Sequence, residues 1–124
     1  MQERRRFVRF QTRLPLSYTV QPQSPPLQTL TKYIGGGGVC FFGSTPIAAG
    51  TRLQAALTLP ERPELAPFTA EVISCEQEHT RGSSGQRRTV AVDVRFIEIA
   101  PNDQADIMRH IMLSLQPPPP ALPI

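Results

Sequence analysis

A series of short apolar runs, separated by proline and glycine, constrains the fold of this chain more than any other feature. The clearest run is 90–96, where Val90, Val92, Val94 and Phe96 alternate with smaller or charged residues. A period of two is typical of a strand with one buried face. Between the last two runs, residues 76–88 are polar and predict a loop at a hairpin tip. Further strands are predicted at 14–20, 27–34, 39–42, 53–59 and 68–75.

The apolar period changes after residue 100. Pro101 suits the first position of a helix, and Asp103 falls in the first turn, where the helix dipole favours an anion. The four prolines from Pro117 prevent the helix from continuing. One apolar stripe is predicted along this helix from Ile107, Met108, Ile111, Met112 and Leu115.

The order of these elements predicts one domain over residues 3–115, dominated by β-structure. Six short strands followed by a helix favour a six-stranded antiparallel β-barrel over 13–100. The helix, 101–115, would cover one opening of the barrel or pack on a partner. A basic flexible arm is expected over 1–12 and a Pro-rich tail over 116–124.

Catalysis finds little support among the residue types. The chain has two histidines, His79 and His110, and its carboxylates are scattered, whereas a catalytic site needs a nucleophile beside a base or a pair of carboxylates. The spacing of Cys40 and Cys75 fits no metal site, and both are interpreted as buried thiols in a reducing compartment. The sequence therefore predicts a binding protein and not an enzyme, with neither metal nor cofactor.

The distribution of apolar residues also bears on location. No apolar run approaches the roughly 18 residues that a transmembrane helix needs, and no signal-peptide-like stretch follows the basic N-terminus. We therefore expect a cytoplasmic protein without membrane insertion.

Cationic residues gather at the N-terminus. All of them except Lys32 are arginines, and Arg4, Arg5, Arg6 and Arg9 lie within the first ten residues. The planar guanidinium group suits phosphate oxygens and the guanine edge, and it can stack on a base. The run 35–38 consists of four glycines, which let a backbone approach closely. It is no phosphate-binding loop, because it lacks the Lys-Ser/Thr ending and a following helix. An anionic ligand, held mainly by the arm, is predicted.

These segments resemble the PilZ domain family, whose members are bacterial receptors for cyclic di-GMP. Segment 3–10, followed by 14–18, is similar to the start of the family's domain, with Arg5 and Arg9 at the arginines of its RxxxR motif. Segments 50–53 and 92–97 resemble its later Gly-Thr-x-Leu turn and Val-x-Phe strand. The family's second motif, Asp/Asn-x-Ser-x-x-Gly, corresponds to 33–38. The resemblance implies a ligand-binding set of Arg4, Arg5, Arg9, Tyr33, Gly35 and Gly38.

The second motif departs from the family pattern. Tyr33 stands where the family has Asp or Asn, and Gly35 where it has Ser, whereas Gly38 is retained. A tyrosine does not accept hydrogen bonds as a carboxylate does. Two functions therefore remain open.

The first is a cyclic di-GMP receptor whose arm changes conformation on binding and signals to an unknown protein partner in trans. The second is a degenerate PilZ domain that binds no nucleotide and acts through protein contacts. A nucleic-acid-binding barrel would need stacking platforms. The chain has six Phe, two Tyr and no Trp, several of them expected in the core, so no nucleic-acid partner is predicted.

Overall fold

The computed structural model describes residues 9–20, 22–82 and 85–115, which form seven strands and one helix. All six predicted strands are present, and the helix begins at Pro101 as predicted. In chain order the elements are β1 (Arg9–Gln11), β2 (Pro15–Thr19), β3 (Leu27–Gly35), β4 (Gly38–Gly43), β5 (Arg52–Leu57), β6 (Ala66–Gly82), β7 (Gly85–Ile99) and α1 (Pro101–Leu115).

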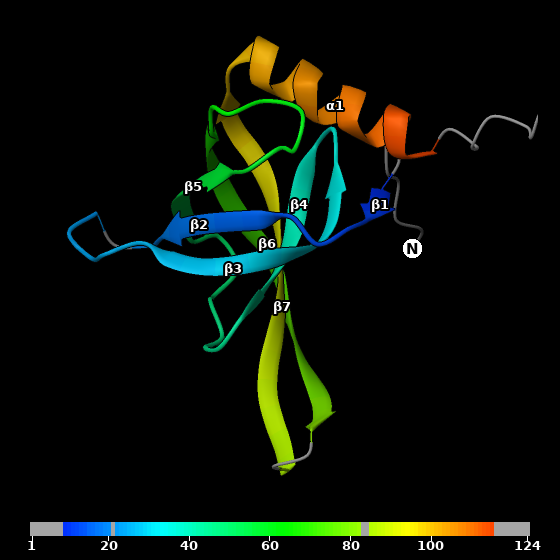
Figure 1. The fold of residues 1–124 in the computed structure, drawn as a ribbon. Helices are drawn as coiled ribbons and strands as arrows, with labels where there is room; N and C mark the ends of the chain where they lie inside the picture. The colour runs from blue at the N-terminus through cyan, green and yellow to red at the C-terminus, as the bar shows by residue number, and fades with distance from the viewer. Residues whose placement is uncertain (1–8, 21, 83–84, 116–124) are drawn as a thin grey trace, which may run out of the picture.

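The strands close into a barrel. They follow the order β3-β2-β5-β6-β7-β4, and a further pairing between β3 and β4 joins the two ends of this series. All pairings are antiparallel. The fold is therefore the predicted six-stranded antiparallel barrel with a C-terminal helix (Figure 1).

The strand β1 was not predicted. It lies within the segment 1–12 that the sequence suggested as an arm, and it pairs with the end of β3. Phe10 explains why this part of the segment docks, because its half-buried ring packs against the barrel core. Residues 1–8 and the Pro-rich tail 116–124 lie outside the described residues.

Inward-facing side chains fill the barrel and are covered by α1 at one end (Figure 1). Phe41, Ile34 and Leu57 have no exposed surface, and the ring of Phe41 lies 4.6 Å from that of Tyr18 between centroids. Ile107 and Ile111 of α1 belong to the same cluster. The helix thus covers one opening of the barrel, which is one of the two placements that the sequence predicted.

The predicted single apolar stripe of the helix is wrong. Met108, Met112 and Leu115 are 43%, 64% and 51% exposed, whereas Ile107 and Ile111 are buried. Adjacent helical residues differ by about 100° in direction, so the two sets form neighbouring stripes and only one faces the barrel. No helix among the described residues is long and apolar enough to cross a membrane.

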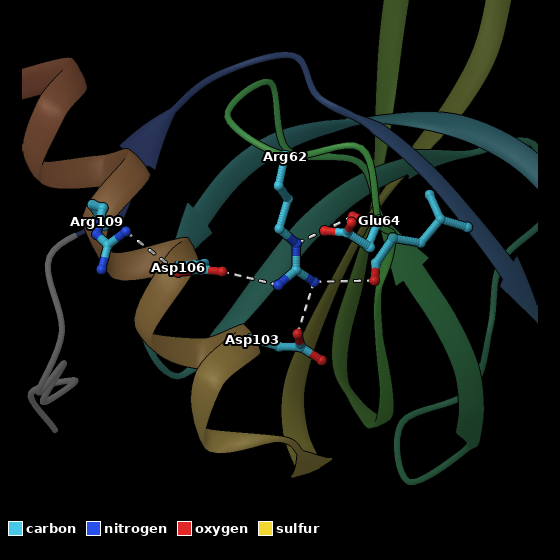
Figure 2. A network of polar contacts seen from close by, with 6 residues as sticks. Arg62, Glu64, Asp103, Asp106 and Arg109 are labelled. Atoms are coloured by element: carbon cyan, nitrogen blue, oxygen red, sulfur yellow. Dashed lines mark hydrogen bonds and ion pairs between the residues drawn. The ribbon is translucent and has the colours of Figure 1, made fainter.

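Polar contacts fix the helix to the β5–β6 connection, and Arg62 is their centre (Figure 2). Its guanidinium donates to Asp103 at 2.7 Å and to Asp106 at 2.9 Å, both on α1. It also donates to the carbonyl oxygens of Glu64 and Leu65 at 3.1 and 3.0 Å. Arg62 therefore ties its own loop to the first turns of α1, where acidic residues also complement the helix dipole.

A second contact joins the same loop to the middle of α1. His110 of α1 is 7% exposed, and its Nδ1 lies 2.7 Å from Glu61 Oε2. The first turns and the middle of α1 are thus held by side chains from one connection, which sets the orientation of α1 over the barrel.

The predicted polar loop at 76–88 is wrong in most of its length. The strands β6 and β7 continue through it and pair as far as Gly82 and Gly85. In Figure 1 they extend well beyond the barrel as a two-stranded ribbon. A ribbon that leaves the barrel has no core to cover, so polar residues are compatible with its strands, and polarity alone misidentified it as a loop.

We expect Arg62→Met to loosen α1, because it removes four hydrogen bonds while keeping an apolar stem over the loop. Amide hydrogen exchange in α1 should become several times faster, while exchange in the barrel strands stays unchanged. Arg109→Met is the matched control, since Arg109 is 70% exposed and its contact with Asp106 is 3.8 Å. Equal exchange in both variants would contradict this role of Arg62.

Candidate functional site

The pairing of β1 with β3 brings the arginine motif to the glycine run. Arg9 lies opposite Gly35, and Gln11 lies opposite Tyr33. Since alternate residues of a strand share a face, Arg9 is the diagonal neighbour of Tyr33. The Cζ atom of Arg9 lies 4.5 Å from the Tyr33 ring centroid, which is a cation–π contact. The two motifs, distant in sequence, thus meet on one surface.

A β-bulge in β3 directs Tyr33 outward. Thr31 pairs with Phe41, but Tyr33 pairs with Cys40, so Lys32 is an extra residue. Thr31 is fully buried, and its hydroxyl donates to the carbonyl of Thr12 at 2.6 Å. Because of the bulge, both Lys32 and Tyr33 lie outside the core, while Ile34 returns to the inside.

Lys32 links this region to the β6–β7 ribbon. Its ammonium forms an ion pair with Glu78 of β6 and lies 5.7 Å from the Tyr33 ring centroid. The hydrogen bond to Glu78 raises the pKa of Lys32, so this group stays cationic at neutral pH. Two cations therefore lie close to one aromatic ring.

The glycines make the turn from β3 to β4. Glycine is required at position 38 because the backbone of β7 passes close to it. A Cβ atom at Gly38 would lie 2.1 Å from the carbonyl oxygen of Val94 and 2.9 Å from Cα of Arg95. Gly36 accepts a hydrogen bond from Gln104 Nε2 at 2.6 Å, and Gly37 accepts one from the Phe96 amide at 2.9 Å. The turn is thus attached to both α1 and β7.

Residues around this turn form a surface that we call the glycine face. Gly35, which is buried, and Gly38 lie at its base, and their neighbours Ile34 and Val39 point into the core. Arg95 of β7 pairs with Gly38 and makes an ion pair with Glu71. The glycine face consists of Arg9, Tyr33, Gly35, Gly38, Asp93 and Arg95.

A buried thiol underlies the same region. Cys40 lies between Tyr33 and Asp93 in the pairing of β3, β4 and β7, and it is 5% exposed. Burial, followed by the nearby Asp93 carboxylate, raises the pKa of the Cys40 thiol to about 11. Cys40 is therefore protonated at neutral pH and is no nucleophile. Among the described residues, no group of three or more metal-ligating side chains is placed to hold an ion.

Four of the six predicted ligand-binding residues come together here: Arg9, Tyr33, Gly35 and Gly38. The other two, Arg4 and Arg5, lie outside the described residues. Sequence reasoning missed Asp93 and Arg95, although the strict alternation of 90–96 already placed them on one outward face. It could not show that this face adjoins the glycine turn, because that depends on the pairing of β4 with β7.

We expect Gly38→Ala to destabilise the fold by about 1–3 kcal/mol, because the added methyl group overlaps backbone atoms that cannot move independently. Gly43→Ala is the matched control, since its Cβ would first meet a side-chain methyl of Val90 at 3.2 Å. Urea unfolding of both variants measures the difference. A cost for Gly43→Ala equal to that of Gly38→Ala would refute the argument.

The two thiols should differ in reactivity. With a pKa of about 11, only about one Cys40 side chain in a thousand is ionised near pH 8, and alkylation needs the thiolate. We expect iodoacetamide to modify the partly exposed Cys75 well before Cys40 in the native protein. Single-cysteine variants, Cys40→Ser and Cys75→Ser, separate the two signals. In urea both should react alike; fast native labelling of Cys40 would contradict its burial.

Comparison with solved structures finds the same fold in PilZ proteins. The PilZ domain with c-di-GMP of YcgR from Escherichia coli matches with a TM-score of 0.71 and 19% identity over 91% of this chain and 92% of that one. The inhibitor of motility MotI/DgrA of Bacillus subtilis matches with a TM-score of 0.65 and 21% identity, over 91% of this chain and 52% of its own.

The MrkH–c-di-GMP complex from K. pneumonia has a TM-score of 0.65 and 19% identity over 91% of this chain and 52% of that one. This chain thus spans about half the length of the MotI and MrkH chains and nearly all of the YcgR domain. No curated protein matches its sequence.

The sequence itself is matched by the PilZ domain family model over residues 3–113. This match covers the arginine motif, the barrel and nearly all of α1. The chain belongs to the PilZ domain family.

Proposed function

We propose that this protein is a cyclic di-GMP receptor whose ligand lies on the glycine face. The observation that carries the proposal is the position of Arg9, which lies opposite Gly35 at the glycine turn and contacts the Tyr33 ring. A flat base or a phosphate approaches backbone closely only where side chains are absent. A guanidinium group at the rim supplies charge and a planar stacking surface. The PilZ family and the likeness to c-di-GMP-bound YcgR support this ligand.

In this proposal the arm completes the site. Arg4 and Arg5 precede Arg9 by a few residues and add the charge that a dianionic nucleotide requires. The described cations Lys32 and Arg95 already have carboxylate partners, Glu78 and Glu71. Ligand charge therefore falls mainly to the arm, 1–12, and in this proposal the arm changes conformation on binding.

The departure in the second motif predicts reduced affinity. An Asp or Asn at position 33 would accept hydrogen bonds from guanine, and Tyr33 does not replace them. Each lost hydrogen bond that involves charge weakens binding by about 1.5–3 kcal/mol, roughly 10- to 100-fold. We therefore expect weaker binding than that of family members that keep both motif residues.

Signalling to a protein partner would start at the glycine turn. Gly36 is hydrogen-bonded to Gln104 of α1, so a shift of the turn is passed to the helix that seals the barrel. The outward residues Met108, Met112 and Leu115 would then report ligand binding on the helix surface.

Replacement of both polar motif residues favours a second candidate function, a PilZ scaffold without nucleotide. Here Tyr33 and Gly35 would be ordinary surface residues, and the protein would act through constitutive protein contacts. The two functions differ in one measurement, which is the affinity of the purified chain for cyclic di-GMP.

We expect titration calorimetry to detect cyclic di-GMP binding, and Arg9→Ala to weaken it by about 10- to 100-fold through loss of a charged contact. Arg13→Ala is the matched control, because Arg13 also lies over a ring, 5.0 Å from the Phe42 centroid, but outside the RxxxR pattern. Cyclic di-AMP tests the preference for guanine. Absence of heat with the wild-type chain at high ligand would favour the second function, and equal effects of both substitutions would contradict the assignment of the ligand to the glycine face.

A further inference from the structure

Tyr33 does more than occupy the position of a lost polar residue. Its ring contacts the guanidinium of Arg9 at 4.5 Å, so the arginine of the first motif is held by the aromatic residue of the second. Both residues are half-buried, which strengthens an electrostatic contact relative to bulk water. The two motifs are therefore connected within the chain itself.

The register of β1 and β3 explains why this contact forms. Diagonal neighbours in an antiparallel pair have Cβ atoms about 7–8 Å apart, a gap that an arginine and a tyrosine side chain bridge together. The residue directly opposite Arg9 is Gly35, which has no side chain to stand in the way. The glycine that replaces the family's serine thus leaves the path from Arg9 to Tyr33 open.

We propose that Tyr33 is a positioning residue that holds Arg9 in place for the nucleotide. This inference rests on the proposed function, since it assigns a role in that same site. An arginine side chain loses considerable rotamer freedom when it is fixed by a ligand. Here the ring fixes it in advance, and pre-organisation of this kind raises affinity without a new contact to the ligand. The ring thereby restores part of the binding affinity that is lost with the family's carboxylate or amide at this position.

Competition between the Tyr33 ring and a guanine base for Arg9 would have the opposite effect on affinity. If the ring competed with the guanine base for Arg9, removing it would strengthen binding. If Tyr33 positions Arg9, removing the ring weakens binding. The sign of one change in affinity therefore distinguishes the two.

The test uses two substitutions at Tyr33 in the full chain. Tyr33→Phe keeps the aromatic face and removes the hydroxyl, and it should bind cyclic di-GMP within about twofold of wild type. Tyr33→Leu keeps apolar bulk and removes the π face, and it should bind about 3- to 10-fold more weakly, the range that a half-exposed cation–π contact implies. Equal or tighter binding by Tyr33→Leu would overturn the inference.

A double-mutant cycle shows whether the effect passes through Arg9. In an Arg9→Ala background, Tyr33→Leu should have no further effect on affinity, because no guanidinium remains to be held. Full additivity of the two changes would mean that Tyr33 acts independently of Arg9. Phe42→Leu is the matched control, since it removes the corresponding ring beneath Arg13 and should leave affinity unchanged.

A second readout needs no ligand and separates this inference from the proposed function. The NMR signal of the Arg9 Nε–H group should be shifted by the ring current of Tyr33, and the shift should persist in Tyr33→Phe and vanish in Tyr33→Leu. If wild type binds no cyclic di-GMP, the proposed function fails, whereas this signal still shows whether the ring holds Arg9. An Arg9 signal that is unchanged in Tyr33→Leu would refute the positioning role directly.

Discussion

The structure depends on the ability of one strand, β3, to pair with three others. Its first half pairs with β2, its second half with β4, and its last residues also with β1. The β3–β4 pairing closes the barrel, and the β1 pairing brings the arginine motif to the glycine turn. Closure of the barrel and formation of the candidate site thus both depend on the last residues of β3, which pair with β4 and with β1.

In this arrangement the motif glycines have two different roles, one in packing of the backbone and one beside Arg9. Gly38 is required by the approach of the Val94 carbonyl, whether or not a nucleotide binds. Gly35, in contrast, lies opposite Arg9 and places no side chain beside it. Retention of a motif glycine is therefore weak evidence for ligand binding in this fold, whereas the residue opposite Arg9 bears directly on it. The helix adds a third constraint, because Gln104 holds the carbonyl of Gly36.

The spacing of apolar residues and the composition predicted the fold more completely than the candidate site. Alternation over 90–96 identified the central part of β7, and Pro101 identified the start of α1. The bulge at Lys32 escaped detection because the buried residue before it, Thr31, is polar and gives no apolar signal. The strand β1 has three residues, which are too few to show an alternation of apolar and polar residues. Proximity of Arg9 to Gly35 was implied only by resemblance to a family, since register is a property of paired strands and not of either sequence alone.

The bulge has a consequence for any comparison or redesign of this domain. One extra residue in β3 reverses the inside–outside parity of everything that follows it, from Tyr33 onward. A sequence alignment that ignores the bulge would match Tyr33 with a core residue of a relative and misassign its neighbours. Regular pairing of β3 with Lys32 retained would turn Tyr33 toward the barrel interior and Ile34 toward solvent, whereas deleting Lys32 would remove the bulge and leave both orientations as they are. Transfer of the motif to another PilZ scaffold therefore has to include either the irregularity in the strand or a deletion that compensates for it.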